Sequence, residues 1–191
     1  METTKWKLEP SHSELEFQIR HMMISNVVGH FRKFDATAEV DGDDFTTSNI
    51  DFTADIDSID TNNAQRDGHL KSADFFDMER FPQIQLAGAR LEKTGAEKYR
   101  LYGNLTMHGV TKPVTLDVTY GGTVKDPWGN MRSGFMAEGR LNRKDYGLNW
   151  NQLTETGGLV ASDEVLVRAN LEFIKSKEKE MPGEQHLAAA A

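Results

Sequence analysis

Short runs in which apolar and polar side chains alternate are the feature that most restricts how this chain can fold. In residues 14–20, Leu15, Phe17 and Ile19 fall on one side of an extended chain and polar side chains fall on the other. The same period recurs at residues 6–8, 50–57, 84–86, 101–107, 114–120, 135–141 and 165–173. Eight or more strands, each with one apolar face, predict an antiparallel β-sandwich or a closed β-barrel.

Two details refine this prediction. Phe31 and Phe34 are three residues apart, so the segment 28–40 is predicted to be one strand with a bulge or bend near Arg32. Glycines within the predicted strands favour a barrel, because sharp curvature is easiest without a side chain; they lie at positions 103, 134 and 139.

Composition excludes several classes of function. The net charge of −8 and the lack of clustered Lys and Arg argue against nucleic-acid binding. The chain has no cysteine, which excludes disulfides, thiolate nucleophiles and cysteine-based metal sites. No apolar run approaches the roughly 20 residues of a membrane helix.

The chain length of 191 residues suits one domain. We expect the domain to cover residues 1–175, and residues 176–191, with their charges, Pro-Gly pair and alanine run, to form a flexible tail. The first ten residues carry no signal-peptide pattern, so we expect a cytoplasmic protein.

The segment 61–82 interrupts the strand pattern. Thr61 or Asn62 is a good N-cap for a helix over residues 62–72, and Ser72 is a candidate cap for a second short turn over residues 72–77. A polar cluster beside an aromatic cluster is typical of a lid over a barrel cavity; the residues concerned are Arg66, Asp67, His69, Phe75, Phe76 and Phe81.

Five motifs, in order, resemble the YceI-like family of bacterial polyisoprenoid-binding proteins. They are HSELEFQIRHM (12–22), VVGHFRKFDA (27–36), TNNAQRDGHLKSADFFD (61–77) with FPQI (81–84), GNLTMHGVTKPVTL (103–116) and AEGRLNRKDYGLNW (137–150). The resemblance covers about residues 6–175 and implies a lipocalin-like barrel whose apolar interior holds a long-chain isoprenoid lipid. We therefore predict an all-β fold, an eight-stranded antiparallel lipocalin-like barrel with a short helical insertion at residues 62–77.

The predicted ligand is a polyisoprenoid or an isoprenoid quinone, bound without any cofactor. Apolar side chains predicted to face it are Phe17, Ile19, Phe52, Leu70, Phe75, Phe76, Leu105, Leu116 and Phe135, and each could instead belong to a filled core. Arg66 and His69 are predicted to meet a polar head group, or else to form surface pairs. For Asp67 we favour a structural role, tying the helix to the sheet.

No motif predicts catalysis or metal binding. The histidines show no ligand spacing, and G-x-S-x-G is absent. Trp128, in the turn 126–129, could touch a membrane surface transiently, although folding back onto its hairpin is the preferred alternative. The resemblance also raises a homodimer, which the sequence does not decide.

Two other functions stay open. One is a lipid-modifying enzyme that uses His21, Arg66 or His69 as acid, base or anion clamp. The other is a structural or stress-response barrel whose interior is packed and holds no ligand.

Overall fold

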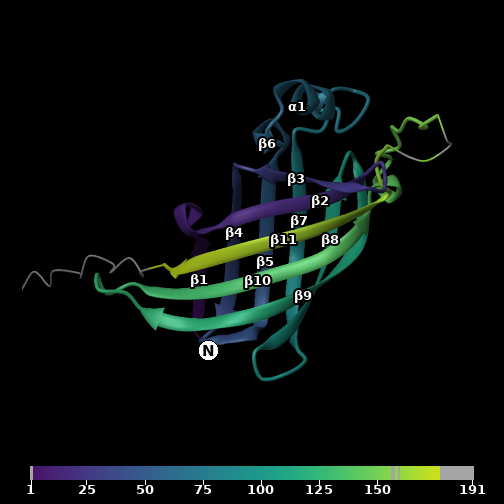
Figure 1. Ribbon diagram of the computed structural model, residues 1–191. Helices are drawn as coiled ribbons and strands as arrows, with labels where there is room; N and C mark the ends of the chain where they lie inside the picture. Colours follow the sequence, from purple (N-terminus) through teal and green to yellow (C-terminus); the bar gives the residue numbers. More distant parts are fainter. Residues whose placement is uncertain (1, 156–157, 159, 177–191) are drawn as a thin grey trace, which may run out of the picture.

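The chain forms a closed antiparallel β-barrel in the computed structural model, which describes residues 2–155, 158 and 160–176 (Figure 1). The strands are β1 (Thr3–Leu8), β2 (Glu14–His21), β3 (Ser25–Phe31), β4 (Phe34–Asp41), β5 (Asp44–Asp55), β6 (Ile59–Asp60), β7 (Gln83–Lys93), β8 (Lys98–Met107), β9 (Val110–Lys125), β10 (Met131–Asn142) and β11 (Glu164–Lys175). The helix is α1 (Ala64–Lys71), and the short 3-10 turns are η1 (Pro10–His12), η2 (Ile56–Ser58) and η3 (Arg143–Tyr146).

Eight strands close the barrel in the order β1-β4-β5-β7-β8-β9-β10-β11, and β11 pairs back with β1. Each of these pairings is antiparallel. The predicted fold class, an all-β eight-stranded antiparallel barrel with a helical insertion, is therefore confirmed.

Two long strands of the barrel wall are broken in the middle. The first consists of β1 and β2, which η1 separates and which both pair with β11, through Leu8↔Phe173 and Glu14↔Asn170. Pro10 explains this break, because proline fixes φ and has no N–H to donate to a sheet. The second consists of β3 and β4, so the bend predicted near Arg32 is present as an interruption at residues 32–33.

The helical insertion is shorter than predicted. α1 begins after Asn63, whose Oδ1 accepts a hydrogen bond from the Arg66 N–H at 2.9 Å, so neither Thr61 nor Asn62 is the N-cap. The short second turn predicted at residues 72–77 is present as a hydrogen-bonded turn and not as a second helix, with the Phe75 N–H donating to the Ser72 carbonyl at 3.0 Å. Ser72 ends α1, since its N–H and its Oγ both donate to the His69 carbonyl, and non-helical turns follow.

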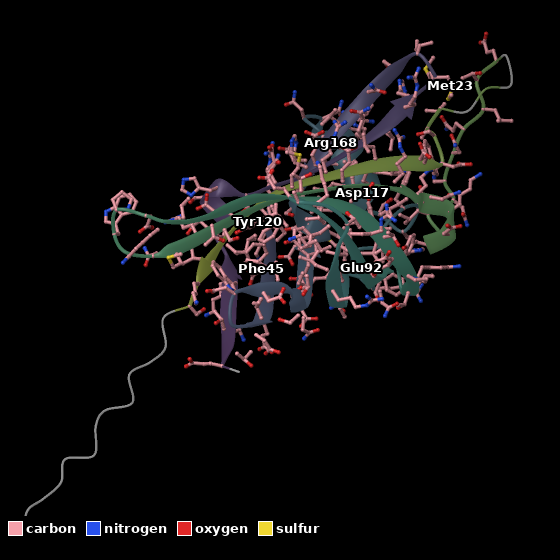
Figure 2. All side chains as sticks on the ribbon, turned by 90° about the horizontal axis from the view of Figure 1, so that it is seen from below. Met23, Phe45, Glu92, Asp117, Tyr120 and Arg168 are labelled. Carbon is pink, nitrogen blue, oxygen red and sulfur yellow. The ribbon has the colours of Figure 1, made fainter. Side chains whose placement is uncertain are left out.

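The two ends of the barrel differ in what surrounds them. We call the end that carries α1, η3 and the described residues 147–155 and 160–163 the helix end. We call the other the aromatic end, because contacting rings fill it: Trp6, Phe45, Tyr99, Tyr120, Phe135 and Phe173. Figure 2 shows Phe45 and Tyr120 inside the barrel wall, far from Met23 at the other end.

Two points concern the chain ends and membranes. No helix within the described residues is long and apolar enough to cross a bilayer. The tail predicted at residues 176–191 lies outside the described residues, except for Ser176.

Candidate ligand-binding cavity

The barrel contains a cavity of about 220 Å³ between the aromatic cluster and the helix end. Roughly 10–15 Å³ suffices for one water molecule, so this space accommodates a ligand of many heavy atoms. The described lining residues are Leu15, Glu16, Phe17, Ile19, Phe31, Ala36, Ile50, Phe52, Ala54, Leu70, Phe75, Phe76, Ile84, Leu86, Leu101, Leu105, Met107, Val114, Leu116, Ala137, Leu141, Arg143, Leu148, Ala161, Val165, Val167, Ala169, Leu171 and Phe173. Only Glu16 and Arg143 among them are charged, which makes the cavity a site for an apolar molecule.

Most of the residues predicted to face a ligand lie on this wall. They are Phe17, Ile19, Phe52, Leu70, Phe75, Phe76, Leu105 and Leu116. Barrel strands supply five of them, while α1 and the turn after it supply Leu70, Phe75 and Phe76. Their contact with a ligand stays a prediction.

Missing side chains on the wall help to make this space. Gly29 lies opposite Phe17 in the β2–β3 pair, and a Cβ atom on Gly29 would lie only 2.3 Å from Phe17 Cζ. The tip of the Phe17 ring therefore occupies the place that a side chain at position 29 would take. Leu116 covers Gly139 in the same way, with 2.3 Å between its Cδ2 and a Cβ built on that glycine.

Phe135 lies elsewhere, contrary to the prediction. Its ring centroid is 5.0 Å from Phe45, 5.3 Å from Tyr120 and 6.0 Å from Phe173, and it does not line the cavity. Period-2 alternation correctly places Phe135 on the inner face of β10, but it does not say how far along the barrel that position lies.

Arg66 does not line the cavity either. Its Nε donates to Thr61 Oγ1 and its Nη2 donates to the Thr61 carbonyl, both at 2.7 Å. Asp67 Oδ1 accepts from the N–H and the hydroxyl of the same threonine at 2.9 and 2.6 Å. These bonds join α1 to the end of β6, which is the structural role expected for Asp67.

His69 also lies outside the cavity, on the surface of the helix end. Its ring meets Trp150 edge-on at 4.7 Å and Phe75 at 5.7 Å, and its Nε2 is 3.3 Å from Asp74 Oδ2. His69 thus contacts a lining residue, Phe75, but is not itself part of the wall.

Arg143 is a charged lining residue that the sequence interpretation missed. It is only 4% exposed and donates to the carbonyls of Leu148, Trp150 and Ser162 at 2.6, 2.8 and 2.9 Å. Burial lowers the pKa of the guanidinium, and the nearby Asp163 carboxylate opposes this effect. Because its donors are used within the protein, Arg143 fixes Leu148, Trp150 and Ser162 at the helix end.

The match to a known family rests on nearly the whole barrel. A model of the YceI-like domain matches residues 6–173. The chain belongs to the YceI-like family. A UPF0312 protein of Staphylococcus aureus strain N315 is 39% identical over 171 residues, which are 89% of this chain and 97% of that protein.

Solved structures of YceI-like proteins share the fold. A Campylobacter jejuni YCEI protein is 32% identical with a TM-score of 0.71, over 83% of this chain and 90% of that chain. A polyisoprenoid binding domain from Saccharophagus degradans has a TM-score of 0.62 at 15% identity, over 90% of this chain and 98% of that chain. The resemblance inferred from the five motifs is thus confirmed.

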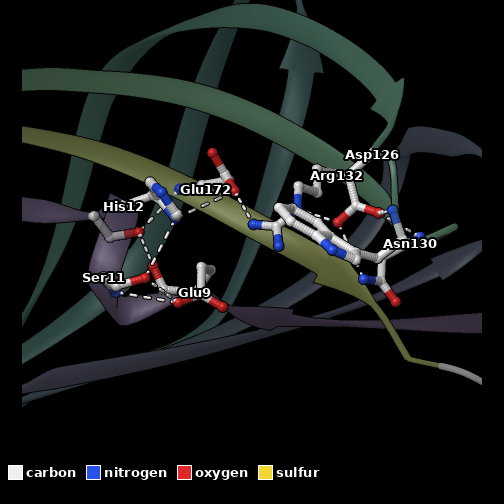
Figure 3. A network of polar contacts seen from close by, with 9 residues as sticks. Glu9, Ser11, His12, Asp126, Asn130, Arg132 and Glu172 are labelled. Carbon is white, nitrogen blue, oxygen red and sulfur yellow. Dashed lines mark hydrogen bonds and ion pairs between the residues drawn. The ribbon is translucent and has the colours of Figure 1, made fainter.

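Among the described residues of this YceI-like barrel, the cavity wall carries few polar groups. The described residues that line the cavity include no Ser, Thr, Cys, His or Asp. Ser11 Oγ and Glu172 Oε1 lie 3.3 and 3.8 Å from His12, but both approach Nδ1, whereas a relay uses both ring nitrogens (Figure 3). His21 ends β2 and forms a bridge with Ala161. Within the described residues, no group of three His, Cys, Asp or Glu side chains is placed to hold a metal ion.

Trp128 lies at the aromatic end, in the β9–β10 turn, away from the cavity. Its side chain is 77% exposed, so the preferred prediction that it folds back onto its hairpin is wrong. The turn itself is fixed by Asp126 Oδ1, which accepts from the Trp128 and Asn130 N–H groups at 3.0 and 2.8 Å.

Proposed function

We propose that the protein binds, stores or carries an isoprenoid lipid or an isoprenoid quinone, held without a covalent bond in the barrel cavity. The observation that carries this proposal is a cavity of about 220 Å³ with an apolar wall. The one arginine among its described lining residues, Arg143, already donates to backbone carbonyls. A filled structural barrel does not account for that space.

The chemistry of the wall indicates which part of the ligand lies inside. Burying one CH₂ contributes roughly 0.8 kcal/mol, so a five-carbon isoprene unit adds on the order of 3 kcal/mol before immobilisation costs. A polar head group would find few free partners on such a wall and would remain at the helix end. The YceI-like family and its polyisoprenoid-binding structural neighbour support an isoprenoid as the chain.

Mass spectrometry tests the proposal directly. Native spectra of the purified protein, followed by extraction into organic solvent, should show a stoichiometric lipid whose mass increases in isoprene units. An empty protein that also takes up no added polyprenol or quinone would contradict the proposal.

A matched pair of variants locates the ligand. Ala137 lines the cavity, whereas the preceding residue, Met136, points outward and is 53% exposed. Ala137→Phe should fill the cavity and reduce the lipid bound or shorten its chain, while Met136→Phe should leave the lipid unchanged. Equal loading of the two variants would place the ligand outside the barrel.

A further inference from the structure

The most exposed apolar side chains of the helix end lie on two neighbouring segments. We call Met22, Met23, Ile24 and Leu153 the apolar tip; they are 43%, 59%, 79% and 71% exposed. The first three form the turn between β2 and β3, and Figure 2 shows Met23 projecting at the margin of the molecule.

The backbone of this turn is unfavourable for the residues that occupy it. Met22 and Met23 have φ angles of 50° and 61°, and the Ile24 N–H donates to the His21 carbonyl at 3.1 Å. Hairpin turns in which both central residues have positive φ normally carry Asn-Gly, Asp-Gly or Gly-Gly. The β8–β9 turn at the same barrel end follows that preference better, with Gly109 as its second central residue. The turn at Met22 and Met23 thus accepts strain and presents two thioether side chains to solvent.

Hydrogen bonds hold the apolar tip against the cavity end. The Met22 N–H donates to the Val160 carbonyl at 2.9 Å, and the Val160 N–H donates to the Gln152 carbonyl at 3.0 Å, which places Leu153 beside the turn. Arg20 Nη2 donates to the Met23 carbonyl at 2.7 Å. The apolar tip also adjoins the cavity, because the preceding residue, His21, pairs with Ala161, which lines the cavity.

We propose that the apolar tip inserts into the surface of a lipid bilayer and so brings the helix end of the cavity to the membrane. The choice of a bilayer as the partner rests on the proposed function, because an isoprenoid cargo is drawn from and returned to lipid. The charge pattern supports insertion and not electrostatic attraction. Residues 22–29 contain no charged side chain, and the chain as a whole carries −8.

Flotation with vesicles of phosphatidylcholine tests this docking. Met22→Asn combined with Met23→Gly installs the preferred turn residues, so the variant should fold at least as stably as the natural chain while losing the apolar side chains. Its binding to vesicles should fall about tenfold or more. Met136→Gln removes an equally exposed methionine from the outer face of β10 and should not change flotation. Replacing part of the phosphatidylcholine with anionic phosphatidylglycerol should leave binding unchanged or lower it.

Several results would overturn the proposal. One is a natural chain that does not float. Another is a Trp128→Ser variant that does not float while the double variant floats normally. A third is binding that requires anionic lipid and is lost in salt. A dimer that the double variant converts to a monomer, with no flotation of either protein, would assign the apolar tip to a second copy of the chain.

Loading from solution separates this proposal from the proposed function. The double variant should take up a polyprenol added from ethanol to the same extent as the natural chain, but should acquire it from vesicles about tenfold more slowly. A natural chain that floats yet takes up no polyprenol would remove the isoprenoid function and leave docking in place. A chain that loads from ethanol but never floats would remove membrane docking and leave the isoprenoid function in place.

Discussion

The two ends of the barrel are built from the same strands and filled with different side chains. On β10 and β11, Ala137 lies opposite Ala169 and both line the cavity, whereas Phe135 lies opposite Leu171 just two residues along. Phe135 joins the rings that fill the aromatic end. The β10–β11 pairing is continuous through both places, so along this pair the size of the inward side chains decides where the barrel is solid and where it is hollow.

The largest difference in stability should appear when one aromatic ring is removed from the aromatic end and one from the cavity wall. Phe45 is buried among Trp6, Tyr120 and Phe135, so Phe45→Ala should lower the free energy of unfolding by about 3–5 kcal/mol. Phe17 borders empty space, so Phe17→Ala should cost roughly 1–2 kcal/mol. Urea unfolding of the empty protein measures both, and equal losses would mean that the cavity is collapsed in solution.

The stability of the helix end should depend on one buried cation, the guanidinium of Arg143. Arg143→Met leaves the carbonyls of Leu148 and Trp150 without their donor, and we expect a loss of about 2–3 kcal/mol in unfolding free energy. Arg140, on the preceding strand β10, pairs with Glu164 on the exposed surface, so Arg140→Met should change stability by about 0.5 kcal/mol or less. Similar effects of the two substitutions would contradict the role assigned to Arg143.

The strands were predictable because each has one buried face, which produces alternation that is visible over a few residues. The position of α1 was predictable to within two residues from the good helix formers that follow residues 61–63, although the N-cap is Asn63 and not Thr61 or Asn62. The level of a side chain along the barrel was not predictable in this way, since it depends on the tilt and stagger of paired strands, and Phe135 was misplaced for that reason.

The polar residues were harder to place than the apolar ones. Arg66 and Arg143 are both arginines near the end of an element, and the sequence shows no difference between them that would reveal their partners. Arg143 is buried because the carbonyls of Leu148, Trp150 and Ser162, which follow it by 5, 7 and 19 residues, converge on it. Arg66 donates its side-chain hydrogen bonds to Thr61, five residues before it.

A smaller effect on the free energy of unfolding should come from Asp126 at the aromatic end, and this effect should depend on pH. Burial raises the pKa of the Asp126 carboxyl, but hydrogen bonds from Arg132 and Asn130 outweigh it and hold the pKa well below its ordinary value of 3.8 (Figure 3). A carboxyl pKa that is depressed in the folded state adds stability above the ordinary pKa, and this contribution is lost as the pH falls through the folded pKa. The stability advantage of the natural chain over Asp126→Asn should therefore narrow as the pH drops below about 4.

Urea unfolding at a series of pH values between 7 and 3 measures that advantage. Arg132 also pairs with Glu172 on β11, so Glu172→Gln gives a second measure of the same cluster. An advantage that widens toward low pH would show that Asp126 is not stabilised as a carboxylate.

The smallest effect on stability, and the sharpest on the cavity, should come from adding one methyl group. In Gly29→Ala the new Cβ would meet the tip of the Phe17 ring, so the ring must swing away from the wall and into the cavity. Alanine stiffens the unfolded chain relative to glycine, so the change in unfolding free energy should stay within about 1 kcal/mol. Gly134→Ala, on the strand β10, meets no atom within 4 Å and serves as the control. Lipid uptake should fall in Gly29→Ala alone, because there the ring occupies space that the ligand needs. Equal uptake by the two variants would show that the position of Phe17 over Gly29 does not shape the binding site.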